Sequence, residues 1–365
     1  MTRAYIADRI FTGEEWLHYY AMIVEDGRIQ QLLPVTCLPS GVMVEAFPDC
    51  LIAPAFIDLQ IYGSHGKLLA LYPEADSLFK LDEYCKGGGA LYFMPTVATN
   101  KTEVFKQCID AVRDYWSQGG EGALGLHLEG PWINPAKRGA HIESLIHPPE
   151  VEEVRSLLDY GKDVIKMITL APEVCSKEVI DLILSYGIVL SAGHSNATYG
   201  EAMLGFERGI NAVTHLFNAM SALQHREPGL VGATMNHHSA MASIIADGYH
   251  VDYAAIRIAK EVMRQRLFAI TDAVTETTGG YYPHKPAGNK YEASGILSGS
   301  ALTMNKAVKN LTQFAGIDLE EALNMCSLYP AQVIHREHEL GRIKKGYLTR
   351  LVVLDNELEV RQAIN

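Results

Sequence analysis

Eight short apolar runs, separated by segments of helical character, occupy most of the chain between residues 51 and 271. The runs cover residues 51–61, 90–94, 123–128, 164–170, 188–192, 212–216, 242–246 and 267–271. Parallel strands that are buried on both faces have continuous apolar sequences of this kind. Eight of them alternating with helices over roughly 220 residues are what a (β/α)8 barrel of the TIM type requires. We therefore predict an α/β fold with this barrel at residues 51–340.

The main rival fold is an open, doubly wound parallel sheet. That fold would carry a G-x-G-x-x-G turn after its first strand, and the sequence has none there. The segments between the runs carry helix signals, for example at residues 149–158 and 176–186. After the barrel, Asp318 with Glu321 predicts the N-terminus of a helix that ends before Pro330.

Both ends of the chain are rich in short predicted strands. These lie at residues 4–10, 21–25, 28–33, 341–343 and 351–354. The Asp26-Gly27 pair between two of them is a strong hairpin signal. We expect residues 1–50 and 341–365 to pair into one small sheet domain that flanks the barrel.

Charge and cysteine usage exclude several classes of protein. With 31 Lys+Arg against 43 Asp+Glu, the net charge is -12 and no dense basic run is present, so we do not expect a nucleic-acid partner. The N-terminus lacks the pattern of a signal peptide, and no apolar stretch approaches the ~20 residues of a membrane span. The six cysteines are Cys37, Cys50, Cys85, Cys108, Cys175 and Cys326, and no C-x-x-C pair occurs among them. We therefore expect the cysteines to be reduced, in a soluble, cytoplasmic protein.

Polar residues gather at the C-terminal ends of the predicted barrel strands, where barrel enzymes keep their chemistry. They are Asp58, Gln60, Thr96, Glu129, Glu173, His194, His215, Asp247 and Asp272. One such residue alone would be explained as a cap of the next helix, but barrel geometry brings all strand ends toward one axis. Glu129, His194 and His215 supply one carboxylate and two imidazoles, the ligand set of a catalytic zinc site that keeps a position open. The sequence therefore predicts a metal-dependent hydrolase.

Several longer motifs carry a family resemblance. They are His-Leu-Glu-Gly-Pro at 127–131, Lys-Arg-Gly-Ala-His at 137–141, Ala-Gly-His-Ser at 192–195, Thr-His-Leu-Phe-Asn-Ala-Met at 214–220, Arg-Glu-Pro-Gly-Leu at 226–230, Ala-Asp-Gly-Tyr-His-Val-Asp at 246–252, Thr-Asp-Ala at 271–273 and Leu-Ser-Gly-Ser at 297–300. In this order they resemble the N-acetylglucosamine-6-phosphate deacetylase family of the amidohydrolase superfamily. The resemblance implies a (β/α)8 barrel with a small β-sandwich domain built from both termini, and a homodimer with sites near the subunit contact.

The resemblance also implies roles for individual residues. Glu129, His194 and His215 would be the metal ligands, and Asp272 would be the general base and acid. Arg226 would anchor the phosphate, because a guanidinium fork matches phosphate oxygens. The implied substrate-binding residues are Ala140, His141, Asn218, Ala219, Arg226, Asp247, His250, Leu297, Ser298 and Gly299. Whether His141 or His250 polarises the acetamide stays open.

The first barrel strand departs from a common superfamily pattern. Many amidohydrolases hold a second metal with a His-x-His pair there, and this chain has Gln60-Ile61-Tyr62. Since neither Gln nor neutral Tyr is a favoured zinc ligand, we expect one divalent ion per subunit. Zinc is the first choice, but the ligand set also suits iron and manganese. The nearby loop residue His65 is expected to be structural or to face solvent.

The expected reaction is deacetylation of N-acetylglucosamine 6-phosphate to glucosamine 6-phosphate and acetate. Three alternatives remain at this stage: another N-acetylated sugar phosphate such as the galactosamine epimer, a cyclic amide, or a catalytically silent barrel that binds a sugar phosphate. The segment 277–292, rich in Gly, Tyr and Pro, is a candidate lid over the site.

Overall fold

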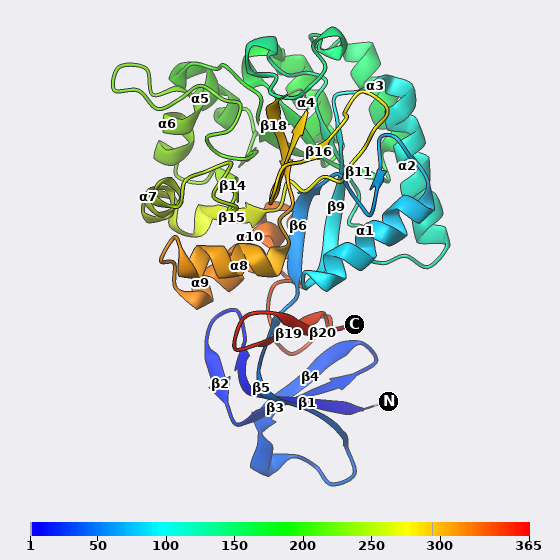
Figure 1. Ribbon diagram of the computed structural model, residues 1–365, viewed down its shortest axis with the longest axis vertical. Coiled ribbons are helices and arrows are strands. Elements are labelled where there is room, and N and C mark those ends of the chain that lie inside the picture. Colours follow the sequence, from blue (N-terminus) through cyan, green and yellow to red (C-terminus); the bar gives the residue numbers. More distant parts are fainter. Residues whose placement is uncertain (1, 294) are drawn as a thin grey trace.

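The computed structural model describes residues 2–293 and 295–365 and contains a strand barrel ringed by helices beside a small sheet domain (Figure 1). The barrel sheet has the strand order β15-β14-β13-β12-β11-β10-β9-β6, with every neighbouring pair parallel. Its strands are β6 (Phe56–Ile61), β9 (Ala90–Ala98), β10 (Leu126–Glu129), β11 (Ile165–Leu170), β12 (Val189–Ala192), β13 (Ala212–Val213), β14 (Met241–Ile245) and β15 (Leu267–Ile270). Each predicted apolar run overlaps one of them, so the predicted TIM-type barrel is confirmed.

The barrel closes between β15 and β6 through a few specific bonds. The backbone N–H of Asp272 donates to the carbonyl of Gln60 at 3.0 Å, and that of Tyr62 donates to Ala273 at 2.9 Å. The carboxylate of Asp58 accepts from the backbone N–H of Thr271 at 3.1 Å and from its hydroxyl at 2.5 Å. Burial raises the pKa of Asp58 to about 6. Asp58 therefore links β6 to the end of β15, where the barrel closes.

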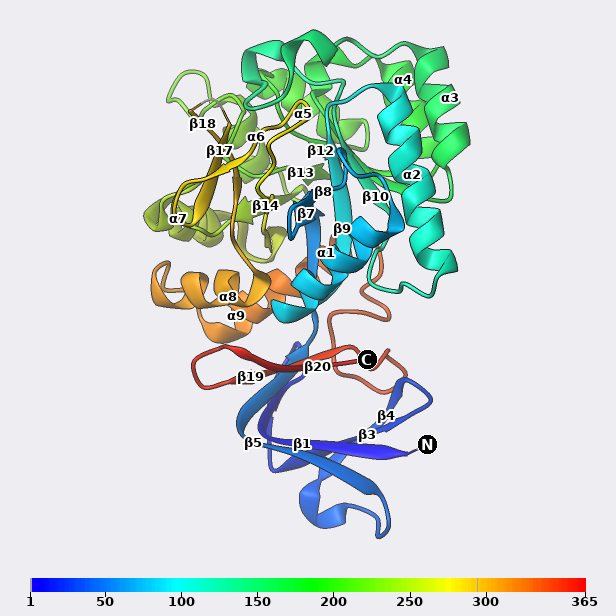
Figure 2. The ribbon, with the colours of Figure 1, turned by 45° about the vertical axis from the view of Figure 1, so that its right-hand side comes forward.

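Helices surround the barrel strands (Figures 1 and 2). They are α1 (Ala75–Gly87), α2 (Thr102–Ser117), α3 (Val151–Gly161), α4 (Lys177–Ser185), α5 (Tyr199–Glu207), α6 (Gly229–Asn236), α7 (Tyr253–Met263), α8 (Met304–Gln313), α9 (Leu319–Cys326) and α10 (Leu328–Val333). The predicted helices at 149–158 and 176–186 correspond to α3 and α4, and the hydroxyl of Ser176 caps α4 by accepting from Val179 N–H. Asp318 precedes α9 as predicted, but its side chain makes no capping hydrogen bond.

The small domain is a seven-stranded sheet made from both termini. Its strands are β1 (Arg3–Phe11), β2 (Trp16–His18), β3 (Tyr20–Glu25), β4 (Arg28–Pro34), β5 (Met43–Pro54), β19 (Leu351–Asp355) and β20 (Val360–Ile364). The Asp26-Gly27 hairpin is confirmed, with φ of 51° and 71°. Met22 of β3, Ile52 of β5 and Val353 of β19 belong to one buried core, so distant strands of the sheet pack together as in a sandwich.

One predicted element of the small domain is wrong. Residues 341–343 are irregular, although the backbone N–H of Ile343 donates to the carbonyl of Thr12 at 2.9 Å. The strand that pairs with β19 at the C-terminus is instead β20. A single hydrogen bond to the N-terminal segment positions residue 343, but no strand pairing continues from it. An apolar sequence pattern alone does not distinguish these two cases.

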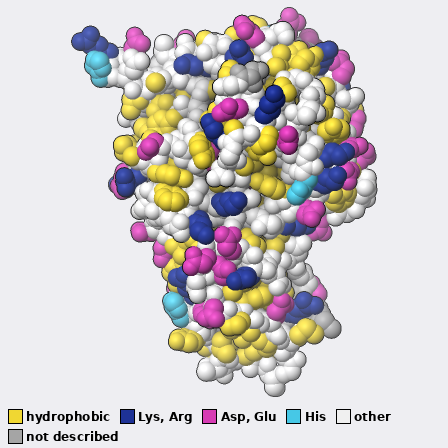
Figure 3. All heavy atoms as spheres, in the orientation of Figure 1, with side chains coloured by type: hydrophobic (Ala, Val, Ile, Leu, Met, Phe, Trp, Pro, Cys, Tyr) yellow, Lys and Arg dark blue, Asp and Glu magenta, His cyan; other side chains and the backbone are white. Residues whose placement is uncertain are grey.

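Two short sheets lie outside the barrel wall. One is the hairpin of β7 (Gly63–Ser64) and β8 (Lys67–Leu68), and the other consists of β16 (Lys285–Pro286), β17 (Lys290–Ala293) and β18 (Ile296–Ser300). The candidate lid segment 277–292 therefore contains strand structure. The face seen in Figure 3 carries interspersed basic and acidic side chains. No described helix is long and apolar enough to cross a membrane, and every described cysteine is a free thiol.

Candidate metal centre and active site

Glu129, the last residue of β10, is the centre of a buried cluster of imidazoles. Its Oε1 lies 3.1 Å from Nε2 of His215 and 3.3 Å from Nε2 of His194. The two Nε2 atoms lie 3.1 Å from each other. All three residues are buried, with exposed fractions of 2% for Glu129 and 5% for each histidine. The three strand ends thus bring together the predicted ligands.

These separations suit a tetrahedral metal ion. Ligand atoms at about 2.0–2.1 Å from zinc in that geometry stand roughly 3.3 Å apart, close to all three distances. The Nδ1 atom of His194 lies 3.0 Å from the carbonyl of Lys137, so Nδ1 carries the proton and Nε2 presents its lone pair. Burial lowers the pKa of His194, which favours the neutral, metal-binding imidazole.

The carboxylate of Glu129 is held in its ionised form. Burial opposes ionisation, but His194 and the hydrogen bonds from His141, His194 and His215 hold the pKa of Glu129 well below its usual value. His141 approaches the other oxygen, Oε2, at 3.2 Å. Glu129, His141 and His194 consequently form a second group that could hold a metal ion, with ligand atoms within 4.8 Å of one another. Both groups share Glu129 and His194.

The main chain turns sharply where it presents three of these side chains. His194, His215 and Asp272 have φ of 47°, 36° and 54°. These are left-handed conformations, in which non-glycine residues are uncommon and which cost of order 1–3 kcal/mol. Such conformations persist only where the surrounding structure imposes them. Here they direct all three side chains toward the cluster around Glu129.

Asp272 lies beside this cluster in a second chain of polar groups. Its Oδ2 is 3.7 Å from Nε2 of His250, and Nδ1 of His250 is 2.6 Å from Oδ2 of Asp247. Burial raises the pKa of Asp272 to about 8, and the charge of Glu129 acts in the same direction. Burial also opposes ionisation of Asp247, but the hydrogen bond from His250 lowers its pKa. Asp247 therefore fixes the ring of His250 with its Nε2 toward Asp272.

Gln60 and Tyr62 link Glu129 to Asp272. Nε2 of Gln60 is 3.0 Å from Oε1 of Glu129 and 2.8 Å from Oδ1 of Asp272. The hydroxyl of Tyr62 donates to Oε2 of Glu129 at 2.5 Å and lies 3.3 Å from Oδ1 of Asp272. The residues at the His-x-His position are thus engaged in hydrogen bonds to the carboxylates.

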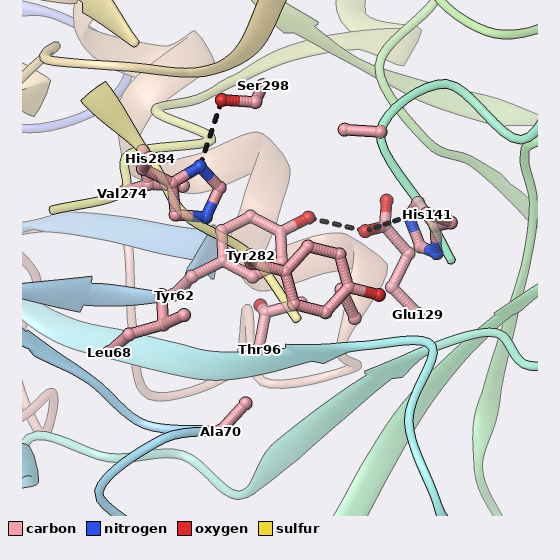
Figure 4. Close-up of a pocket in the computed structure, with 12 residues that line it drawn as sticks. Tyr62, Leu68, Ala70, Thr96, Glu129, His141, Val274, Tyr282, His284 and Ser298 are labelled. Atoms are coloured by element: carbon pink, nitrogen blue, oxygen red, sulfur yellow. Dashed lines mark hydrogen bonds and ion pairs between the residues drawn. The ribbon is translucent and has the colours of Figure 1, made fainter. Parts of the chain in front are cut away.

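A cavity of about 50 Å³ opens beside Glu129 and His141 (Figure 4). Its lining includes the predicted substrate residues Ala140, His141 and Ser298. Leu297 and Gly299 flank Ser298 on β18.

Seven of the predicted substrate residues do not line this cavity, namely Asn218, Ala219, Arg226, Asp247, His250, Leu297 and Gly299. Asn218 and Ala219 lie three and four residues after His215, and the backbone N–H of Asn218 donates to the carbonyl of His215 at 2.9 Å. Arg226 lies on an exposed loop at residues 222–227. It does not line the cavity beside Glu129, so the structure of one chain does not place it as a phosphate anchor there.

Six cavity residues were not predicted individually from the sequence, and two of them lie in a segment that was named only as a candidate lid. Tyr282 and His284 come from the 277–292 segment, and their rings stack with centroids 6.2 Å apart. Burial lowers the pKa of His284 to about 4, so it is neutral. Leu68, Ala70, Ala98 and Val274 complete the set. No period or motif marks these positions; only the aromatic content of the segment pointed toward it.

Comparison with known proteins agrees with this geometry. Residues 51–364 match the Amidohydrolase family, and residues 4–46 match the NagA composite domain. The chain is 31% identical to N-acetylglucosamine-6-phosphate deacetylase of Haemophilus influenzae, over 96% of this chain and 94% of that one. It is also 31% identical to N-acetylgalactosamine-6-phosphate deacetylase of Escherichia coli O157:H7, over 99% and 97%. The structure of N-acetylglucosamine-6-phosphate deacetylase from Pasteurella multocida superposes with a TM-score of 0.95 at 34% identity, covering 100% of this chain and 98% of that chain.

Proposed function

We propose that this chain, which belongs to the amidohydrolase family, hydrolyses N-acetylglucosamine 6-phosphate to glucosamine 6-phosphate and acetate. The relatives and the family support a hydrolase that acts on an amide. The observation that carries the proposal is the convergence of Glu129, His194 and His215 within 3.3 Å of one another, with Asp272 linked to Glu129 through Gln60.

In the proposed site, Glu129, His194 and His215 hold one divalent ion. Bound there, the ion supplies Lewis acidity for amide hydrolysis. We take zinc as the first choice, with iron and manganese as the alternatives that the same ligands suit. The proposal of a single ion rests on Gln60 and Tyr62, which donate hydrogen bonds where a second ion would need ligands.

The proton transfers are assigned to Asp272. Its carboxylate accepts a proton from the attacking water and then delivers it to the nitrogen of the leaving amine as the amide C–N bond breaks. A neighbouring cation favours the ionised form of Asp272, which the first of these transfers needs. His250, oriented by Asp247, stands next to Asp272 and stabilises its charge.

We assign the acetamide contact to His141 and a contact with the sugar to His250. His141 lines the cavity beside Glu129, and its Nδ1 lies 2.7 Å from the hydroxyl of Thr99. An imidazole N–H at this place suits stabilisation of a developing oxyanion. Asn218, Ala219, Leu297 and Gly299 are proposed to complete the sugar site.

The phosphate contact is proposed to involve a second copy of the chain. Arg226 is exposed on the loop at residues 222–227, so it is positioned to reach outward. In a homodimer with its sites near the subunit contact, Arg226 of one protomer would bind the phosphate in the site of its partner. This arrangement gives an acidic protein a local cation for an anionic substrate. A cytoplasmic location belongs to the same proposal, and the free cysteines fit a reducing compartment.

The galactosamine epimer is the second candidate substrate. The named glucosamine and galactosamine relatives are equally similar to this chain, at 31% identity each. A barrel that only binds sugar phosphates is the other alternative, and the presence of Asp272 beside the ligand cluster argues against it, because a sensor needs no acid or base.

One experiment separates these candidates. The metal content of the purified protein is measured by elemental analysis, and acetate release is measured with both N-acetylated epimers. We expect one metal per chain, faster release from the glucosamine substrate, and loss of turnover in Asp272→Asn with the metal retained. Full activity of Asp272→Asn would contradict the mechanism. Tight phosphosugar binding without acetate release would support the sensor instead.

A further inference from the structure

Each barrel strand carries one buried polar side chain before the ligand cluster is reached. Thr214 and Thr271 directly follow β13 and β15, and the other members lie within their strands. All have exposed fractions of 3% or less. The inside of such a barrel is usually packed with branched apolar side chains, so a complete polar layer needs an explanation. Its members are Asp58, Thr96, His127, Thr169, Ser191, Thr214, Ser243 and Thr271.

Four members of this layer form one hydrogen-bonded chain. Nδ1 of His127 lies 3.2 Å from the carbonyl of Leu59, and Nε2 lies 2.7 Å from the hydroxyl of Thr169. The hydroxyl of Thr214 lies 2.7 Å from that of Thr169 and 2.6 Å from that of Ser191. Strands β10 and β6 are not neighbours in the sheet, and neither are β11 and β13. These bonds therefore cross the interior of the barrel.

The chain of hydrogen bonds has one direction. Burial lowers the pKa of His127 to about 4, so the ring is neutral and its proton is on Nδ1, facing the carbonyl of Leu59. Nε2 of His127 then accepts from Thr169, whose oxygen accepts from Thr214, and Thr214 accepts from Ser191. Loss of the Thr214 hydroxyl would leave Thr169 without its donor and Ser191 without its acceptor.

The same threonines support the main chain that carries the two histidine ligands. Thr214 directly precedes His215, and Gly193 directly precedes His194. A Cβ at Gly193 would lie 2.7 Å from Cγ2 of Thr169 and 2.9 Å from Cβ of Thr214. The main chain at Gly193 thus rests on both threonines. The left-handed conformations of His194 and His215 follow directly after these supported positions.

His215 depends on its main chain more than His194 does. Nδ1 of His194 faces the carbonyl of Lys137 at 3.0 Å, whereas the buried Nδ1 of His215 has no hydrogen-bond partner among the residues that the structure describes. Such a partner usually orients the ring of a metal-binding histidine. The backbone N–H of His215 donates instead to the hydroxyl of Ser243 at 2.8 Å. Its ring is therefore placed by the backbone on which Thr214 and Ser243 act.

We infer that Thr214 is a positioning residue for His215: its hydroxyl, held between Thr169 and Ser191, fixes the strained main chain that presents Nε2 of His215 to an ion. The inference rests on the metal site of the proposed function, but it does not depend on the identity of the sugar. Because the ligands are arranged before an ion binds, loss of this hydroxyl should weaken metal binding.

Two substitutions separate the hydroxyl of Thr214 from the rest of its side chain. Thr214→Val keeps the shape and removes the hydroxyl, whereas Thr214→Ser keeps the hydroxyl. The metal-free proteins are titrated with Co²⁺ in competition with a chelator, and the visible spectrum of bound Co²⁺ reports the arrangement of its ligands. We expect Thr214→Val to bind Co²⁺ about 10- to 100-fold more weakly, with a changed spectrum. Thr214→Ser should restore the native affinity and spectrum.

Thr234→Val is the matched control. Thr234 is buried on α6, and its hydroxyl donates to the carbonyl of Leu230 at 2.7 Å, so this variant should bind Co²⁺ as the native protein does. Ser243→Ala removes the acceptor of the His215 N–H and should weaken binding as Thr214→Val does. It decides the matter if thermal unfolding shows that Thr214→Val is not folded. With saturating metal, Thr214→Val should lower kcat and leave KM at the native value.

The outcomes separate this inference from the proposed function. Native affinity and spectrum in Thr214→Val would overturn the role of Thr214 and leave the proposed function intact. Equal weakening in Thr214→Val and Thr214→Ser would also overturn it, because the effect would not follow the hydroxyl. If the native protein binds no Co²⁺, the metal site of the proposed function is wrong and the role of Thr214 is excluded with it.

Discussion

The hydroxyl of Tyr62 donates a hydrogen bond of 2.5 Å to Oε2 of Glu129, the carboxylate at the centre of the proposed metal site. This contact leaves Oε1 to face His194 and His215. Tyr62 and His141 thus both contact Oε2, whereas Oε1 faces His194 and His215 and also accepts from Gln60.

Replacing Tyr62 with Phe should weaken metal binding. Loss of the hydroxyl leaves a buried carboxylate oxygen with one donor fewer and frees the carboxylate to rotate, and comparable outer contacts change metal affinity by about 10- to 100-fold. Competition with a chelator of known affinity measures the effect. Tyr84→Phe is the matched control, since its phenol donates to the carbonyl of Leu302 away from Glu129. Equal metal affinity in both variants would contradict the assigned role.

Asp247→Asn should lower kcat by about 10- to 100-fold while the metal content stays at the native level. Oδ1 of Asp247 accepts from the backbone N–H groups of Tyr249 and His250, so the amide oxygen of the variant keeps that place and its NH2 group faces Nδ1 of His250. The bond that now joins Nδ1 to the carboxylate at 2.6 Å is then lost, and the ring loses its orientation toward Asp272. Steady-state kinetics beside elemental analysis checks this. Asp252→Asn, at the N-cap of α7, is the control and should behave as the native enzyme. Loss of metal in Asp247→Asn would show that Asp247 supports the metal site instead.

Arg226→Ala should raise KM by about 10- to 100-fold with a smaller change in kcat, because a hydrogen bond to a charged group contributes about 1.5–3 kcal/mol. Arg155→Ala, another exposed arginine whose guanidinium pairs with Glu152, should leave both constants unchanged. Sedimentation analysis of the native protein tests the dimer that the assignment requires. A monomer that is fully active would exclude a contact across subunits.

Asp58→Asn should flatten the dependence of stability on pH between about 4 and 6. The ordinary pKa of 3.8 rises to about 6 in the fold, so the native state binds the proton more tightly than the unfolded state does. Stability from this group is therefore greatest at low pH and falls as pH rises through that window, by about 3 kcal/mol. Urea unfolding at pH 4.5 and 6.5 measures the difference. An identical pH dependence in both proteins would show that Asp58 is not the source.

Much of the fold could be predicted because the sequence pattern that marks each barrel strand lies within one short segment. Each apolar run of the barrel is buried on both faces, so a short stretch of sequence is enough to mark the strand. The ligand residues follow from the same pattern, since Glu129 ends β10, and His194 and His215 follow β12 and β13 within two residues. Parallel strands in a closed barrel must direct such residues to one end.

The rest of the site depends on contacts between segments far apart in the chain. Leu68, Tyr282 and His284 reach the cavity from a hairpin and from a segment without regular period, so no local pattern identifies them. Arg226 lies in the specific motif Arg-Glu-Pro-Gly-Leu, but its exposure depends on how the surrounding loop packs, which no local pattern reveals. Asp58 looked like the other polar strand ends, but its partner Thr271 lies at the opposite edge of the sheet.

The sequence by itself determined the barrel, the order of its strands and the residues able to bind a metal, because hydrophobic period and ligand chemistry are properties of short segments. Only the tertiary structure decided which oxygen of Glu129 faces the histidines, how Tyr62 and Gln60 connect it to Asp272, and how small the cavity beside it is. Those features are distances between side chains on different strands and loops, and they exist only once the barrel has closed and the outer segments have packed over its end.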